Sequence, residues 1–471
     1  MREEDCMNAA RRAREGERAS PMIPASWDWQ KKSKNRASLL LEFFPCPIRT
    51  ANAPVASNSP PCSLCPLWLI LISFFKNLLR RIFCKGVTAW LAFLRSSRLQ
   101  LLSPNPSYSV IGFLETASGL GLAARGISEA LSDLHPAEFS ISSLAPTPRV
   151  PALIQNYRSL SGYSASDIAL HVYNPDVFIA AVRRFGTRFI RSNQLNIAIV
   201  VWESESLPPL WSDVLSAYDV ICTYSLVSQL TIERAVRRPV EVLPILLPSQ
   251  PQRLRKSTDK HYEFLFIFDN FSSWERKNPL ASIRAFQMAC SQLPPQVSAR
   301  LRIKCHANTP ADIIEKLQQA AGNSPVEILA RTLGEIEMNE LWQDCDCYLH
   351  LHRAEGYGLP VAEALSRGIP VITTRQGGIL DFTPQEACFF VSGPPAIRPA
   401  QGGDYGDWSG WIEPDLNEAA AHIITVLNDY ENAVARALIG RERIRASTSK
   451  ENIRHRLDQI IQPYLQSNSP Y

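Results

Sequence analysis

Apolar residues follow two alternating patterns along the chain from Ser109 onward. Short apolar runs predict buried strands, and apolar positions spaced three or four residues apart predict amphipathic helices. The runs that predict strands in the first part of this region are residues 109–115, 167–176, 196–205, 219–225 and 239–247. Helical patterns lie between these runs, and strand–helix alternation of this kind predicts a parallel sheet with helices on both faces.

The same alternation returns after a break rich in Pro, Ser, Lys and Arg. Strands are predicted in this second series at residues 263–269, 301–307, 326–329, 345–352 and 370–374. We therefore expect an α/β protein with two Rossmann-like doubly wound domains that face each other across a cleft. The expected limits are residues 105–250 for the first domain, 251–262 for a linker, and 263–471 for the second domain with a helical tail.

The amino-terminal part of the chain lacks this alternation. Residues 1–60 are rich in Arg, Pro, Ser and Asn, which predicts a disordered leader, and they resemble sequence that precedes a later start. Residues 61–104 are predicted to form an apolar and basic amphipathic segment. Its apolar run, Leu67–Phe75, is about half as long as a bilayer requires.

The charge of this amphipathic segment bears on a membrane contact. Between Glu42 and Glu115 there is no acidic residue, but there are seven lysines and arginines. Such a segment is typical of a helix on an anionic membrane surface, so we expect peripheral membrane contact through residues 67–98. The alternative is an ordinary helix packed on the first domain.

The overall composition excludes several classes of protein. The chain is 45% apolar and 20% charged, as in a globular protein, and its net charge of +4 is too small for a dedicated nucleic-acid binder. Cys62 and Cys65 form a single C-x-x-C, without the second pair of a zinc site. Asp344 and Asp346 form an acidic pair of the kind that can bind a metal, but they flank a cysteine at the start of a predicted strand, which is not a convincing setting for a metal site. We therefore expect neither a metal nor another cofactor.

One loop combines two carboxylates with flexible backbone. In "RAEGYGLPVAEALSRG", Glu355 precedes Gly356 and Gly358, and Glu363 lies in the helix that follows. The loop leaves the carboxyl end of the predicted strand 345–352, where the first amides of the helix can face a phosphate. Carboxylates accept hydrogen bonds from sugar and ribose hydroxyls. The combination is what a nucleotide-sugar site requires.

A positive partner for phosphates follows the first predicted strand of the second series. Arg276 and Lys277 lie on the same expected edge of the sheet, and they are suited to a diphosphate. Taken alone, this pair would be interpreted as a solvated surface pair. Together with the two glutamates and their glycines, it favours a binding site.

These motifs resemble a known family. "EGYGLPVAEALSRGIPVI" is similar to the E-x7-E signature of retaining glycosyltransferases of family 4, which have the GT-B fold, and the resemblance covers residues 108–460. "RKNP", "TTRQGGILDF" and "WIEPD" resemble a branch found in bacterial polysaccharide assembly. The resemblance implies catalytic roles for Glu355, Arg276 and Lys277. The donor-binding residues that it implies are Gly119, Gly121, Gly356, Tyr357, Gly358, Leu359 and Glu363.

The chain departs from the family pattern at two places. Leu122 stands where an acidic residue often follows the glycine loop, and Trp202-Glu203 stands where many members have an acceptor-side histidine. Glu203 and His171 are therefore the acceptor-side candidates, although a packed His171 is the simpler interpretation.

The function implied by the resemblance is retaining, metal-independent transfer of a hexose from a nucleotide-diphosphate sugar. The expected acceptor is a glycan or a lipid-linked sugar in polysaccharide biosynthesis, and the expected location is the cytoplasm or the inner face of the cytoplasmic membrane. A non-catalytic scaffold with the GT-B fold and a nucleotide-sugar epimerase are the alternatives.

Overall fold

The structure is a computed structural model, and it describes most of the chain after residue 101. The described residues are 78, 82, 84–89, 102–116, 118–132, 139–143, 166–186, 190, 194–253, 255, 260–269, 272–397 and 408–465. The predicted leader, residues 1–60, lies outside them, as does most of the amphipathic segment.

The first domain is built on a parallel sheet of six strands in the order β2-β1-β3-β4-β5-β6. The strands are β1 (Tyr108–Gly112), β2 (Phe139–Ser143), β3 (Ile168–Val172), β4 (Leu195–Ile199), β5 (Val220–Thr223) and β6 (Val240–Val242). Every residue of β1, β3 and β4 is buried, as expected of central strands covered on both faces.

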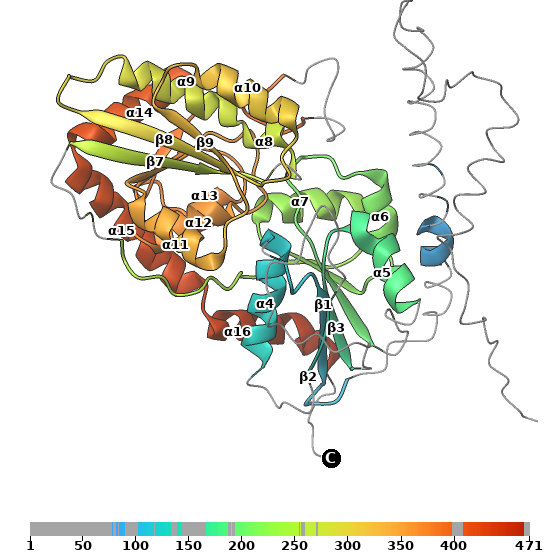
Figure 1. The fold of residues 1–471 in the computed structure, drawn as a ribbon. Helices are drawn as coiled ribbons and strands as arrows, with labels where there is room; N and C mark the ends of the chain where they lie inside the picture. Colours follow the sequence, from blue (N-terminus) through green and yellow to red (C-terminus); the bar gives the residue numbers. More distant parts are fainter. Residues whose placement is uncertain are drawn as a thin grey trace, which may run out of the picture. The chain divides into compact units, whose positions relative to one another are not determined.

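Helices cover both faces of this sheet (Figure 1). They are α4 (Gly119–Leu131), the 3-10 turn η2 (Pro175–Val177), α5 (Phe178–Phe185), α6 (Pro209–Leu215) and α7 (Leu226–Ala235). The apolar side of α4 packs with Val110 and Leu170 on one face, whereas Phe178 and Trp211 pack with Ile111 on the other. The alternation of side chains along each strand thus supplies two separate cores.

The second domain repeats the architecture, with the strand order β12-β11-β10-β7-β8-β9, again parallel throughout. Its strands are β7 (His261–Ile267), β8 (Ser298–Cys305), β9 (Val326–Ala330), β10 (Cys347–His350), β11 (Val371–Thr374) and β12 (Phe389–Val391). The predicted fold class, two doubly wound α/β domains, is confirmed.

Helices flank the second sheet on both faces as well (Figure 1). They are α8 (Trp274–Lys277), α9 (Pro279–Cys290), α10 (Ala311–Ala321), α11 (Glu335–Asp344), α12 (Leu359–Ser366), α13 (Ile379–Phe382), α14 (Leu416–Asn428) and α15 (Tyr430–Ser447). The core on one face joins α9, α10 and α14 to Phe264, Phe266 and Leu349. The core on the other face joins α12 and α15 to Leu265 and Tyr348.

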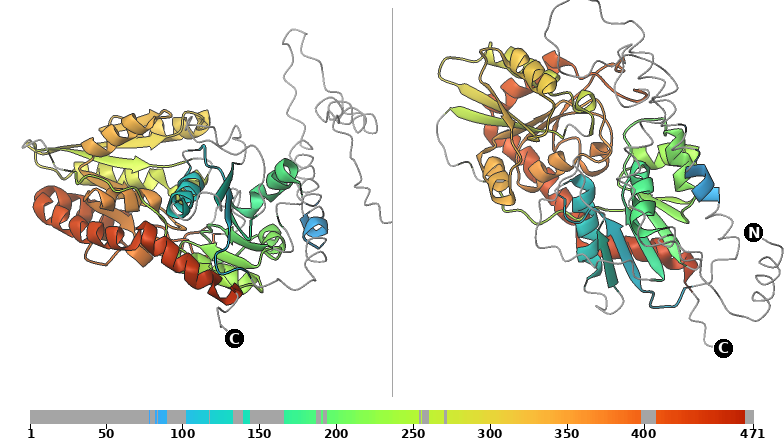
Figure 2. Two further views of the ribbon diagram at one scale, coloured as in Figure 1. Left: turned by 90° about the horizontal axis from the view of Figure 1, so that it is seen from below. Right: turned by 45° about the vertical axis from the view of Figure 1, so that its right-hand side comes forward.

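The last helix does not stay with the second domain, to which the sequence assigned the whole tail. In α16 (Lys450–Ile461), the buried side chains Ile453 and Leu457 belong to the same core as Leu131 of α4. The Arg456 guanidinium also donates a hydrogen bond to Glu241 at 2.6 Å. The helix therefore completes the first domain, and Figure 2 shows it beside α4.

Several elements escaped the sequence patterns, among them two short strands, one short helix and one polar helix. The strands β2 and β12 have five and three residues, and α8 has four, which is too few for a period to appear. Helix α11 is mostly polar and exposed, so no apolar face marks it. The helix ends at Asp344. Strand β10 begins at Cys347, two residues after the predicted strand start at residue 345.

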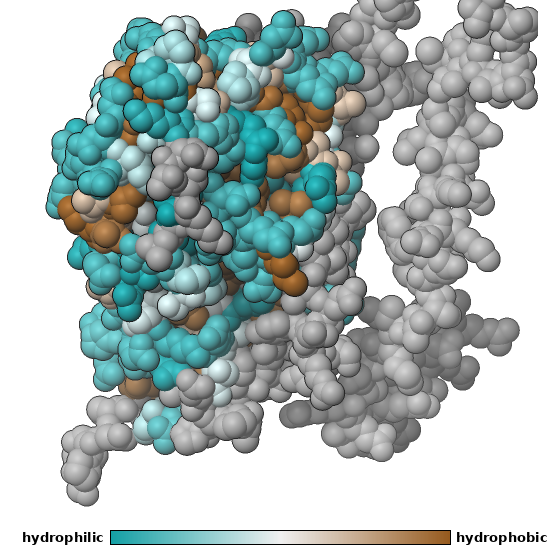
Figure 3. All heavy atoms as spheres, turned by 60° about the vertical axis from the view of Figure 1, so that its left-hand side comes forward, coloured by the Kyte–Doolittle hydropathy of each residue, from teal (hydrophilic) through white to brown (hydrophobic). Residues whose placement is uncertain are grey.

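The amphipathic segment is described only in part. Residues 84–89 are helical; Cys84 is buried in a core with Trp211, and Lys85 lies 3.9 Å from Asp213. In the part of the chain that the structure describes, no helix is long and apolar enough to cross a membrane. The face shown in Figure 3 is mainly hydrophilic, with small scattered apolar areas.

Candidate functional site

The charged residues gather where the strand order of the second sheet reverses. Strands β7 and β10 are neighbours, while the chain runs from β7 outward through β8 and β9 before it returns to β10. The loops that leave two such strands diverge and open a crevice at their carboxyl ends. Helix α8, with Arg276 and Lys277, follows β7, and the loop of Glu355 follows β10.

Helix α8 is held by an unusual local backbone. Ser273 precedes it with φ 64° and Asn278 ends it with φ 54°, both in the left-handed region that costs non-glycine residues about 1–3 kcal/mol. The Ser273 hydroxyl accepts a hydrogen bond from the Arg276 amide, which ties the turn together. The strain aims both cations of α8 into the protein, where Arg276 is only 1% exposed.

Arg276 is held by hydrogen bonds on all sides of its guanidinium. Its Nη1 donates to the Ala354 carbonyl at 2.7 Å, and its Nη2 donates to the Ser272 hydroxyl at 2.6 Å. The carboxylate of Glu355 lies 3.2 Å from Nη1. A planar guanidinium fixed in this way presents its charge at one defined place, which suits a diphosphate.

Glu355 is the centre of the cluster. Its carboxylate is buried and forms ion pairs with Lys277 and Arg276, and it accepts a hydrogen bond from His350. Burial alone would raise the pKa of the Glu355 carboxyl, but Lys277 and then Arg276 hold this pKa well below its usual range. Burial lowers the pKa of Lys277, and the neighbouring Glu355 opposes that shift. The carboxylate is therefore ionised at neutral pH.

The glycines of the loop permit two close approaches. A Cβ atom on Gly356 would lie 2.4 Å from Val201 Cγ1, in the loop that follows β4 of the first domain. Gly358 has φ 96°, and a Cβ there would lie 2.4 Å from Ile379. Gly356 thus lets the two domains meet, and Gly358 makes the turn into α12.

The remaining donor-binding candidates lie around the same loop. A Cβ on Gly119 would lie 2.9 Å from Leu359, so the glycine loop of the first domain does face the loop of Glu355. Gly121 has a local role instead, because a Cβ there would lie 2.4 Å from the Thr116 carbonyl. Tyr357 packs its ring against Phe382, with the ring centres 4.8 Å apart.

Glu363 stands apart from the charged cluster. It lies in α12 and is partly buried, and its carboxylate forms no hydrogen bond or ion pair with the residues that the structure describes. Burial raises the pKa of this carboxyl, and Arg367 opposes the shift only in part. A desolvated carboxylate without a partner is suited to bind hydroxyl groups of a ligand.

The two acceptor-side candidates differ sharply. Glu203 lies 3.4 Å from the Arg276 Nη2 atom, so the structure brings it into the cluster from the first domain. His171 has no exposed surface and packs edge-on against the rings of Tyr173 and Tyr218. In this structure His171 is not open to an acceptor, in agreement with the simpler interpretation of a packed histidine.

Sequence reasoning gave no role to several residues of the site. The side chain of Gln376 accepts a hydrogen bond from the Glu355 amide at 3.3 Å and donates one to the Gly410 carbonyl at 2.8 Å. The Gly378 amide donates to the Glu355 carbonyl at 2.9 Å. The signal that could have found these residues is the glycine pair that follows a buried strand in "TTRQGG".

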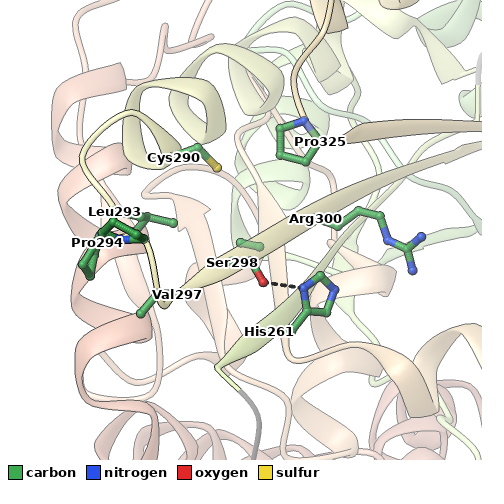
Figure 4. Close-up of a pocket in the computed structure, with 10 residues that line it drawn as sticks. His261, Cys290, Leu293, Pro294, Val297, Ser298, Arg300 and Pro325 are labelled. Carbon is green, nitrogen blue, oxygen red and sulfur yellow. Dashed lines mark hydrogen bonds between the residues drawn. The ribbon is translucent and has the colours of Figure 1, made fainter.

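Another hollow lies away from these residues. Figure 4 shows a surface pocket of about 620 Å³, lined by residues such as His261, Pro294 and Arg300. It is formed at the amino ends of β7 and β8, opposite the edge that carries Arg276 and Glu355, and it brings together none of the predicted site residues. Within the described ranges, no group of three or more His, Cys, Asp or Glu residues could hold a metal ion.

Comparison with known proteins places this site in a family context. Residues 224–457 match the family described as Family 4 Glycosyltransferase in conflict systems. The trehalose synthase of Rubrobacter xylanophilus is 28% identical over 193 residues, which are 40% of this chain and 41% of that relative. The chain thus matches less than half the length of this curated relative.

Solved structures share the fold. HepE of Anabaena has a TM-score of 0.55 at 13% identity, covering 76% of this chain and 99% of HepE. Sucrose-phosphate synthase of Thermosynechococcus elongatus has a TM-score of 0.53 at 14% identity, covering 76% and 98%. The chain has the GT-B fold, and its residues 224–457 are similar to family 4 glycosyltransferases. In this GT-B protein, the E-x7-E loop and the α8 cations both lie within the family match.

Proposed function

We propose that the protein is a retaining glycosyltransferase that moves a hexose from a nucleotide-diphosphate sugar to a glycan or glycolipid acceptor. The observation that carries the proposal is the gathering of Arg276, Lys277 and Glu355 at the strand-order reversal of the second sheet. The first domain faces this cluster with Glu203 and with the loop of Gly119. Cations for a diphosphate and carboxylates for hydroxyls are thereby close together.

The proposed chemistry uses these groups for positioning and for charge. Arg276 and Lys277 hold the diphosphate and stabilise the charge that develops as it leaves. Glu355 accepts hydrogen bonds from the donor sugar, and Glu363 accepts them from the ribose. The bond between the anomeric carbon and the diphosphate breaks, and the acceptor oxygen bonds to that carbon on the same face. Because attack and departure use the same face, the configuration is retained, and the departing phosphate oxygen takes the acceptor proton.

The proposal requires no metal or other cofactor. In this scheme the two cations of α8 supply the positive charge that a divalent ion would otherwise bring to the diphosphate. Asp346, one of the acidic pair considered in the sequence, is buried and accepts a hydrogen bond from Arg253 at 2.6 Å. Its carboxylate therefore serves the packing of the second domain.

The acceptor and the location are the finer parts of the proposal. We propose a glycan or lipid-linked sugar of polysaccharide assembly as the acceptor, and peripheral contact with the inner face of the cytoplasmic membrane through residues 67–98. The basic residues and apolar positions of that segment support this contact. Most of the segment lies outside the described residues.

Two alternatives keep the fold but change the outcome. A scaffold protein would not release nucleotide at all, and a nucleotide-sugar epimerase would act on its donor without an acceptor. The ionised Glu355, paired with two buried cations, favours an enzyme over a scaffold, because buried charges without a ligand to bind cost stability. Nucleotide release that depends on an acceptor distinguishes the transferase from both.

The first test is calorimetric titration of the full chain with UDP, GDP and ADP. HepE was solved with UDP and glucose, which makes UDP the first probe. We expect one nucleotide to bind selectively and an Arg276→Ala/Lys277→Ala variant to lose that binding. Arg300→Ala, which removes a cation at the opposite end of the same sheet, is the matched control and should bind as the wild type does.

The double variant leaves Glu355 buried without its cations, so a second variant guards against misfolding. Arg276→Gln/Lys277→Gln/Glu355→Gln removes both signs of charge together and should keep its melting temperature closer to that of the wild type. If this folded variant binds the nucleotide as tightly as the wild type, or if the wild type binds none of the three, the diphosphate assignment is wrong.

A further inference from the structure

A histidine lies directly beneath the carboxylate of Glu355. His350 is the last residue of β10 and has no exposed surface, and its Nε2 atom lies 3.0 Å from Glu355 Oε1. The loop that leaves β10 turns back over the strand, so residues five positions apart come into contact. The sequence alternation of His350 and His352 with leucines gave no indication of this contact.

The charge of Glu355 fixes which way this hydrogen bond runs. Lys277 and Arg276 keep the carboxylate ionised, and an ionised carboxylate can only accept hydrogen bonds. The Nε2 atom of His350 must therefore carry a proton and donate a hydrogen bond to Oε1. The opposite arrangement would place a nitrogen lone pair against a carboxylate oxygen.

The other ring nitrogen of His350 faces a hydroxyl group. Its Nδ1 atom lies 3.3 Å from the Tyr348 hydroxyl. Burial lowers the pKa of His350 and outweighs the opposing effect of Glu355, so the ring is neutral and Nδ1 is an acceptor. Burial raises the pKa of Tyr348 well above its usual range, so this hydroxyl keeps its proton. It can donate a hydrogen bond to Nδ1 or to the Ile267 carbonyl, which lies 3.4 Å away.

Aromatic contacts hold the imidazole ring in this orientation. It stacks on Tyr348 at 5.5 Å and on His352 at 5.0 Å between ring centres, and it lies 5.3 Å from the ring of Phe266. His352 is itself fixed, because its Nε2 atom lies 3.1 Å from the Gln376 carbonyl. The ring of His350 is therefore packed tightly enough to hold its neighbour.

We propose that His350 is a positioning residue for the reaction, which orients Glu355 through the chain Tyr348–His350–Glu355. The inference rests on the proposed transfer function and deepens it. With Oε1 bound by His350 and Lys277, and Oε2 beside Arg276, the carboxylate cannot rotate about its terminal bond. The acceptor site that remains on Oε2 then has one fixed direction, as a hydrogen bond from the donor sugar would require.

The first test concerns the proton and does not require a donor. Long-range ¹H–¹⁵N spectra of the full chain, labelled with ¹⁵N-histidine, would be assigned by comparison with His350→Gln. At neutral pH we expect His350 to be neutral with its proton on Nε2, and Tyr348→Phe to shift the Nδ1 resonance. A proton on Nδ1, or spectra that Tyr348→Phe leaves unchanged, would refute the proposed chain.

The second test separates positioning from stability. UDP-glucose, GDP-glucose and ADP-glucose would be supplied as donors together with a panel of oligosaccharide acceptors, and acceptor-dependent nucleotide release would be measured for the wild type, His350→Phe and His350→Gln. Phenylalanine preserves the stacking without the donor group, and the amide of glutamine restores a donor near Nε2. We expect His350→Phe to lower kcat about tenfold or more with KM nearly unchanged, and His350→Gln to recover most of it.

The outcomes distinguish this inference from the proposed function. If His350→Phe releases nucleotide as fast as the wild type, or if both variants lose activity equally and in step with their melting temperatures, the positioning role is refuted. If the wild type acts on none of the donors, the transfer function itself fails and the catalytic role of His350 fails with it. The spectra would still report whether the hydrogen-bonded chain exists.

Discussion

Arg276 of the second domain lies 3.4 Å from Glu203 of the first, so one ion pair joins the two sides of the candidate site. The same guanidinium lies 3.2 Å from Glu355. Both carboxylates therefore pair with Arg276, the cation that the proposed function assigns to a diphosphate. A donor that binds at Arg276 must compete with Glu203, the more distant of the two.

Replacing Glu203 with glutamine should remove this competition. We expect Glu203→Gln to bind UDP, or whichever nucleotide the wild type selects, about three to ten times more tightly, since the competing contact is worth roughly 1 kcal/mol. Calorimetry at constant ionic strength would measure the change. Glu205→Gln, two residues further along the same loop, is the control. Unchanged or weaker binding by Glu203→Gln alone would show that Glu203 does not compete with the diphosphate.

Glu355 should make stability depend on pH in a defined direction. Its pKa in the folded protein lies well below the ordinary value of 4.5, so its stabilising contribution is complete above that value and disappears as the pH falls through the folded pKa. We expect Glu355→Gln to lose about 3–5 kcal/mol of unfolding free energy at pH 7, because it leaves buried cations without their partner. Urea unfolding would measure this loss.

The comparison across pH provides the check. The difference in unfolding free energy between wild type and Glu355→Gln should be constant from pH 7 to pH 5 and should shrink below pH 4.5. A difference that stays the same down to pH 3 would mean that the loss comes from altered packing instead of the charge on Glu355.

Gly358 offers a matched test of close packing. Gly358 and Gly322 both have positive φ, at 96° and 53°, but a Cβ on Gly358 would lie 2.4 Å from Ile379, whereas one on Gly322 would lie no closer than 4.0 Å to its nearest neighbour. Alanine costs about 1–2 kcal/mol in backbone strain at Gly358, where ψ is 46°, and at least as much at Gly322, where ψ is −129°. We expect Gly358→Ala to lose about 1–3 kcal/mol more through overpacking, and Ile379→Ala to relieve that part of the loss when the two are combined. Thermal unfolding of the single and double variants would isolate the contact, and strictly additive losses would contradict it.

The Glu363 carboxylate should destabilise the ligand-free protein and strengthen the binding of nucleotide. Burial raises its folded pKa, so the ionised form opposes folding above its ordinary pKa, and the cost disappears in acid, where the carboxyl is protonated. We expect Glu363→Gln to raise the melting temperature by about 1–3 °C at pH 8, with no gain at pH 4. The same variant should bind nucleotide about tenfold more weakly, as measured by calorimetry.

An exposed glutamate provides the control for this prediction. Glu315 lies on α10 and faces solvent, so Glu315→Gln should change neither the melting temperature nor nucleotide binding. A loss of stability in Glu363→Gln at pH 8 would indicate that this carboxylate is stabilised by the fold.

Much of the architecture could be predicted because it depends on local patterns. Buried central strands such as β4 lie within apolar runs, although the predicted run 196–205 extends beyond the strand end at Ile199. The parallel alternation with helices fixes the fold class. The loop of Glu355 could be placed because its glycines and carboxylates follow such a strand directly. Short edge strands such as β12 carry too few residues for any pattern to show.

The rest depends on contacts between distant segments. The residues around Glu203 in the sequence do not indicate Arg276 as its partner, because the two are brought together only when both sheets have formed. His350 alternates with leucines as a strand residue should, so the sequence does not show its hydrogen bond to Glu355, which depends on the backward turn of the loop. In the same way, α16 shows an apolar face but not which domain that face will cover.

The path of α16 has a consequence for the order in which the protein can be made. The first domain contains the strands that leave the ribosome first, yet Ile453 and Leu457 of its core are among the last residues of the described chain to be synthesised. Until they arrive, the side of α4 that they cover remains open to water and to other chains. The domain that begins first therefore finishes last. A ribosome that stops within α15 would release one chain with two unequal domains: a second domain with its core nearly complete, and a first domain with an uncovered apolar face.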